Sequence, residues 1–73
     1  MTEARVQLNS IDRVKAFAKR IVSYPCDCDL LSGNYVIDAK SLMGIFSLDL
    51  SKPLTLRIHE NHADLSAIQE FLI

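Results

Sequence analysis

The chain has 73 residues, of which 49% are hydrophobic and 23% are charged, and its formal net charge is −1. This length corresponds to one small domain, residues 1–73, and the composition is too apolar for intrinsic disorder. The balanced charge gives no support to a nucleic acid or an anionic membrane as partner, and no apolar run is long enough to span a membrane.

The N-terminal third of the chain predicts a strand followed by a helix. Residues 4–9 alternate between polar and apolar side chains, which is typical of a half-buried strand with Val6 and Leu8 toward the core. Residues 11–23 follow the 3.6-residue period of a helix, and Ser10 is a suitable N-cap. The predicted buried face of this helix comprises Ile11, Val14, Phe17, Ala18, Ile21 and Val22.

The middle of the chain predicts a β-hairpin. Residues 26–31 and 35–38 are short strand-like segments, and residues 32–34, Ser-Gly-Asn, favour a turn between them. Cys26 and Cys28 are predicted to face the core as reduced thiols, because two thiols offer too few ligands for zinc and no metal site is expected. Reduced thiols and the absence of a secretory signal predict a cytoplasmic protein.

The last part of the chain predicts a short helix, a strand and a final helix. Residues 41–48 form an apolar helix that Ser41 would cap. Residues 54–59 alternate again and predict a strand. Asn61 would then cap a last helix, whose predicted buried face comprises Leu65, Ile68 and Leu72.

The order of these elements predicts an α+β fold. One four-stranded antiparallel sheet with three helices on one face, an open-faced β-sandwich, would bury every apolar face described above. The sequence contains no recognisable nucleophile–base pair, paired carboxylates in a cleft or glycine-rich phosphate loop. An enzyme is therefore not expected, and no cofactor is implied.

Residues 39–48, Ala-Lys-Ser-Leu-Met-Gly-Ile-Phe-Ser-Leu, resemble a characteristic segment of the HPr phosphocarrier family, Lys-Ser-Ile-Met-Gly-Val-Met-Ser-Leu. The segment lies between the third and fourth predicted strands, as it does in that family, and the resemblance continues through residues 54–58. It implies the HPr-like open-faced β-sandwich, βαββαβα, over essentially the whole chain. It also implies a bacterial protein of the phosphoenolpyruvate-dependent sugar phosphotransferase system.

The first half of the chain resembles the family much less closely. HPr proteins carry Gly-Leu/Ile-His-Ala-Arg-Pro where the first strand meets the first helix, and this histidine accepts the phosphoryl group. Here residues 9–14 read Asn-Ser-Ile-Asp-Arg-Val, so no histidine falls at the acceptor position, although Arg13 can be aligned with the family arginine. Serine, isoleucine and aspartate cannot form a phosphohistidine. The resemblance therefore implies a degenerate member without phosphohistidine transfer.

The resemblance also suggests functional residues. Ser41 matches the serine that HPr kinase modifies in many HPr proteins, and the alternative is that it only caps a helix. Arg13 is a candidate anion-binding residue, for which a solvated surface charge is the simpler interpretation. A partner-binding patch, unless it packs under neighbouring loops, is predicted for Leu42, Met43, Ile45 and Phe46.

We therefore interpret the sequence as that of a regulatory, protein-binding module. The implied partners are phosphotransferase-system components, HPr kinase or a transcriptional regulator. The alternative interpretation is a structural or homo-oligomeric interaction domain unrelated to sugar transport, such as a homodimer that hides the apolar patch of residues 41–48. The sequence leaves the oligomeric state and the identity of the partner open.

Overall fold

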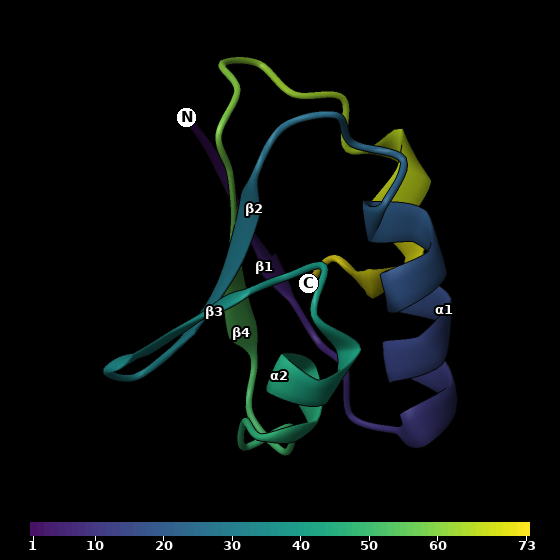
Figure 1. Ribbon diagram of the computed structural model, residues 1–73. Coiled ribbons are helices and arrows are strands. Elements are labelled where there is room, and N and C mark those ends of the chain that lie inside the picture. The colour runs from purple at the N-terminus through teal and green to yellow at the C-terminus, as the bar shows by residue number, and fades with distance from the viewer.

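The computed structural model, which describes residues 1–73, is an open-faced β-sandwich (Figure 1). Its elements are β1 (Thr2–Val6), α1 (Ile11–Ile21), β2 (Cys28–Ser32), β3 (Tyr35–Asp38), α2 (Leu42–Phe46), β4 (Leu54–Ile58) and the 3₁₀ helix η1 (Ser66–Phe71). The four strands form one antiparallel sheet in the order β1-β4-β2-β3. Figure 1 shows all three helices on the same side of this sheet, which confirms the predicted α+β fold.

The core lies between the sheet and the helices, where the alternating side chains of the strands meet the buried face of α1. Leu54, Leu56 and Ile58 of the central strand β4 have no exposed surface, as their alternation predicted. The rings of Phe17 and Phe71 pack edge to face with their centroids 5.5 Å apart. No charged side chain is buried in this layer, and apolar packing dominates the core. The hydroxyl of the buried Tyr24 donates to the carbonyl of Asp64.

Two serines begin the two α-helices, as predicted. The Ser10 hydroxyl accepts a hydrogen bond from the Arg13 N–H at 3.1 Å, and the Ser41 hydroxyl accepts one from the Gly44 N–H at 3.2 Å. The buried face of α1 is narrower than predicted, because Ile11 is 63% exposed and Val22 is 61% exposed. Ile11 is the first residue of the helix and Val22 follows its last, so both lie beyond the part that the sheet covers.

The C-terminal prediction was wrong in two respects. Asn61 caps no helix, and its side-chain oxygen instead accepts a hydrogen bond from the N-terminal amino group. The last helix is a 3₁₀ helix without a side-chain cap, and Ile68 and Phe71 are buried while Leu72 is only half-buried. A 3₁₀ helix brings residues three apart to one side, which places Phe71 where an α-helix would have placed Leu72.

The C-terminal residues cover the outer edge of β1. The N–H of Gln7 donates to the carbonyl of Phe71 at 2.9 Å, and the N–H of Ile73 donates to the carbonyl of Arg5 at 3.1 Å. These bonds satisfy backbone groups that an edge strand would otherwise leave open. The same contacts fix the C-terminal end of the chain beside β1.

Candidate functional site

The predicted partner-binding patch on α2 is only partly exposed. Met43 is 80% exposed, and Leu42 and Phe46 are each 40% exposed. Ile45 has no exposed surface, because it points from this five-residue helix into the core. Ile45 therefore cannot contact a partner, and its inclusion in the patch was wrong.

A groove between α1 and α2 extends this exposed apolar surface. Its lining consists of three apolar residues and three lysines, with no carboxylate: Lys15, Ala18, Lys19, Val22, Lys40 and Leu42. Lys15 and Lys19 lie four residues apart and therefore on one side of α1. Their spacing is visible in the sequence, but only the packing of α1 against α2 shows that this side borders the patch.

The groove lysines have no anionic partner within the molecule. The ion pairs of the structure join Arg20 to Glu70, Arg57 to Glu3 and His59 to Asp29, and none includes a groove lysine. A concave surface lined by uncompensated charge of one sign attracts groups of the opposite sign. The groove therefore combines apolar contact area with an attraction for carboxylates or phosphates.

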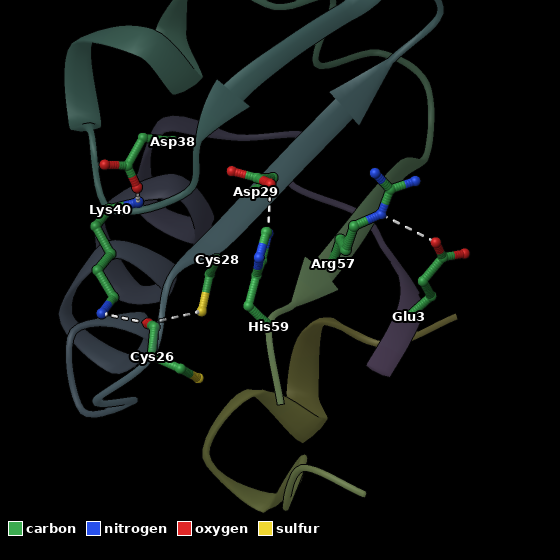
Figure 2. Close-up of polar contacts among 8 residues, drawn as sticks. All are labelled: Glu3, Cys26, Cys28, Asp29, Asp38, Lys40, Arg57 and His59. Atoms are coloured by element: carbon green, nitrogen blue, oxygen red, sulfur yellow. Dashed lines mark hydrogen bonds and ion pairs between the residues drawn. The ribbon is translucent and has the colours of Figure 1, made fainter. Parts of the chain in front are cut away.

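Lys40 differs from the other two lysines because its ammonium group is held in place. Its Nζ donates to the carbonyl of Tyr24 at 2.6 Å. It also donates to the carbonyl of Cys26 at 2.8 Å, a bond that Figure 2 shows. Its backbone N–H donates to the Asp38 carboxylate at 2.9 Å. Both ends of the residue are thus fixed, directly before the serine that caps α2.

Ser41 lies half-buried at the beginning of α2, with its hydroxyl engaged by the Gly44 N–H. A Cβ atom at Gly44 would lie 3.2 Å from the Ser41 hydroxyl oxygen and 3.4 Å from Cδ1 of Ile37. The absence of a side chain at Gly44 therefore leaves room for the cap. The geometry accounts for Ser41 as an N-cap, and its phosphorylation remains a prediction.

Arg13 holds the junction between β1 and α1 together. Its Nε and Nη2 donate to the carbonyl of Gln7 at 3.0 and 2.8 Å, and Nη2 also lies 3.3 Å from the carbonyl of Glu70. The guanidinium carbon lies 5.2 Å from the centre of the Phe71 ring. Arg13 is therefore not a solvated surface charge. Because its N–H donors already bond to backbone carbonyls, the structure also gives no support to an anion-binding role.

The two histidines lie away from this junction. His59 follows β4, and its Nε2 lies 2.7 Å from the Asp29 carboxylate (Figure 2). His62 lies in the loop between β4 and η1, with a left-handed φ of 56°. Figure 1 shows that this loop is at the opposite end of the molecule from the beginning of α1.

The two cysteines are free thiols, and Cys26 lies just before β2 while Cys28 is its first residue. Cys28 is buried, and this burial, together with the neighbouring Cys26, raises the pKa of its thiol to about 11. Cys26 is half-buried and packs against the core. No group of three or more histidine, cysteine, aspartate or glutamate side chains converges in a way that could hold a metal ion.

Comparison with known proteins gives a match in structure but none in sequence. The sequence matches no protein-family model and no curated protein. The structure is similar to that of HPr-C-His from Thermoanaerobacter tengcongensis, with a TM-score of 0.74 and 22% identity over 94% of this chain and 84% of that chain.

A second similar structure is the phosphocarrier protein HPr from Bacillus anthracis str. Ames. The TM-score is 0.69 with 20% identity, over 94% of this chain and 89% of that chain. None of the helices in the present chain is long and apolar enough to cross a membrane. The chain thus has the fold of HPr phosphocarrier proteins.

Proposed function

We propose that the protein is a cytoplasmic, HPr-like module of the sugar phosphotransferase system that binds protein partners and does not transfer phosphate through histidine. The observation that carries this proposal is the face formed by α1 and α2. There, the exposed side chains of Leu42, Met43 and Phe46 adjoin a groove rimmed by lysines without ion pairs. We call this surface the docking face.

The chemistry of the docking face suits a protein partner. Exposed methionine and aromatic side chains grouped on one helix are typical of interface centres, whereas a monomer surface normally scatters them. The unpaired lysines around them favour a partner whose matching surface carries carboxylates, because complementary charge steers association and sets orientation. Phosphotransferase-system components or a transcriptional regulator are the expected partners.

The beginning of α1 supports the second half of the proposal. The residues there are Ser10, Ile11 and Asp12, none of which has an imidazole nitrogen to accept a phosphoryl group. The Ser10 hydroxyl is engaged as the N-cap, and Asp12 adds negative charge where an incoming phosphoryl group would be repelled. The loop that follows β4 and contains both histidines, residues 59–65, lies at the opposite end of the molecule from the beginning of α1 (Figure 1).

We further propose that Ser41 is the regulatory phosphorylation site. It stands at a helix N-terminus beside Lys40, where a phosphate would find a helix dipole and a fixed positive charge. A phosphate would reverse the charge at this edge of the docking face. It would thereby change which partners bind, without any change in the fold.

The test is the intact mass of the protein after incubation in two separate mixtures. One contains ATP and HPr kinase, and the other contains phosphoenolpyruvate and Enzyme I. We expect one phosphoryl group from the kinase mixture alone, and none after the substitution Ser41→Ala. Phosphate gained from phosphoenolpyruvate would refute the absence of histidine transfer, and no gain from the kinase would refute the proposed role of Ser41.

The alternative function is a homo-oligomeric interaction domain, which the same exposed apolar patch favours. A second copy that covered Met43 would make the mass in solution depend on concentration. The substitution Met43→Glu would then restore a monomer, since it would bury a charge at the interface. Analytical ultracentrifugation of the wild type and of Met43→Glu separates this alternative from docking on other proteins.

A further inference from the structure

We infer that Lys40 couples the docking face to the loop between α1 and β2, residues 22–27. The carbonyls of this loop hold the Lys40 ammonium in place for a carboxylate of the partner, and the bound carboxylate in turn stabilises the loop. The contact between Lys40 and the loop concerns the free protein alone. The effect of a bound carboxylate on the loop rests on the proposed docking function.

The loop depends on Lys40 for two of its backbone hydrogen bonds. The carbonyls of Tyr24 and Cys26 receive no backbone N–H, and their nitrogen donor is the Lys40 ammonium, at 2.6 and 2.8 Å. The other contact to the Cys26 carbonyl comes from the thiol of Cys28 at 3.7 Å, which is a weak donor. Loss of Lys40 would therefore leave both partly buried carbonyls without a strong partner.

The same ammonium group has capacity left for an anion. A lysine ammonium has three N–H donors, and two of them serve the loop carbonyls. Lys40 also lines the groove, where it shares no ion pair with a carboxylate. Because the loop already fixes its side chain, Lys40 loses less conformational freedom on binding than Lys15 or Lys19, which are exposed and make no side-chain hydrogen bond.

Thermodynamic linkage gives the sign of the coupling. If the ordered loop raises the affinity of the groove for a carboxylate, the bound carboxylate must favour the ordered loop by the same factor. The thiol of Cys26 reports the state of the loop, because it is half-buried against the core while the loop is closed. Opening of the loop exposes this thiol to an alkylating reagent.

The first experiment measures the alkylation rate of Cys26 by iodoacetamide in the free protein, read by peptide mass spectrometry so that Cys26 and Cys28 are distinguished. We expect Lys40→Met to raise the rate about tenfold, and Lys40→Arg, which keeps the charge and the donors, to raise it much less. Lys52→Met, which removes an exposed lysine outside the groove, is the matched control and should leave the rate unchanged. Amide exchange in β4 verifies that each variant keeps its fold.

The second experiment repeats the measurement with a synthetic peptide of glutamate and leucine as the acidic probe. Binding should slow alkylation of Cys26 severalfold in the wild type and in Lys52→Met, because Lys52 does not line the groove. Lys40→Met should bind the peptide more weakly and show no slowing at saturation, which rules out simple shielding of the thiol by the peptide.

The outcomes separate the inference from the proposed function. An unchanged Cys26 rate in free Lys40→Met would refute the hold of Lys40 on the loop, whatever the docking face does. Peptide binding that leaves the wild-type rate unchanged would refute the coupling and leave the docking function intact. Failure of the wild type to bind the acidic probe would refute the docking chemistry, and the coupling with it.

Discussion

Replacement of Arg13 by alanine should destabilise the protein as strongly as a core mutation, although a sequence-based interpretation places this residue on the surface. The substitution removes the paired donation to the carbonyl of Gln7, the longer contact to the carbonyl of Glu70 and the packing on the Phe71 ring. Hydrogen bonds from a charged donor contribute about 1.5–3 kcal/mol, and an exposed cation–π contact contributes about 0.5–1 kcal/mol. We therefore expect a loss of about 2–3 kcal/mol.

Urea unfolding followed by circular dichroism measures this loss. In thermal unfolding, a domain of this size should show a Tm lower by about 8–24 °C. Arg13→Lys retains the charge but not the forked geometry, and should lose about half as much. Lys15 lies two residues after Arg13 on the exposed side of α1. Lys15→Ala should therefore change the free energy of unfolding by less than about 0.5 kcal/mol. An Arg13→Ala variant as stable as the Lys15→Ala control would refute the structural role of Arg13.

Three further predictions test the pH dependence, the exposed patch and the strained loop. Burial raises the pKa of Cys28 from 9.0 to about 11, so the folded state holds this proton more tightly than the unfolded chain. The contribution of Cys28 to the free energy of unfolding should therefore be fully present below pH 9 and should be lost as the pH rises toward 11. Urea unfolding at about pH 8 and about pH 10.5 measures this loss, which Cys28→Ala should reduce. Met43→Glu should weaken partner binding by about tenfold with stability within about 0.5 kcal/mol, whereas Ile45→Ala should cost about 2–5 kcal/mol, and calorimetry of both variants checks this contrast. His62→Gly, at φ 56°, should raise the urea midpoint slightly, and His62→Val should lower it.

Local sequence signals predicted the elements that depend on near neighbours. The alternation of Leu54, Leu56 and Ile58 predicted β4 because a strand with helices packed on one side of its sheet buries every second side chain. Ser10 and Ser41 were identifiable as caps because an N-cap bonds to a residue three positions onward. Each cap and its bonding partner lie three residues apart, and the strand is recognised from its two-residue alternation alone.

The features that the sequence did not reveal depend on contacts between distant residues. The carbonyl of Glu70 that Arg13 approaches lies 57 residues away, and the carbonyls that Lys40 holds belong to a loop before the hairpin. The 3₁₀ helix at the end of the chain likewise places Phe71 against Phe17, a residue 54 positions earlier in the chain. Ile45 was wrongly assigned to the exposed patch for the same reason. In a helix that is apolar on all sides, the sequence does not indicate which side packs against the core.

The structure separates the two ends of α1 in a way that bears on how such a module works. The N-terminal end is occupied by structural contacts, namely the Ser10 cap and the fork of Arg13 on Gln7. The docking groove is lined by the middle and the C-terminal part of α1 and by the beginning of α2, through Lys15, Ala18, Lys19, Val22, Lys40 and Leu42. Substitution at the first site therefore need not disturb the second. A chain of this fold can keep its partner-binding surface while its helix N-terminus carries no group able to accept phosphate, which is the arrangement that our proposed function requires.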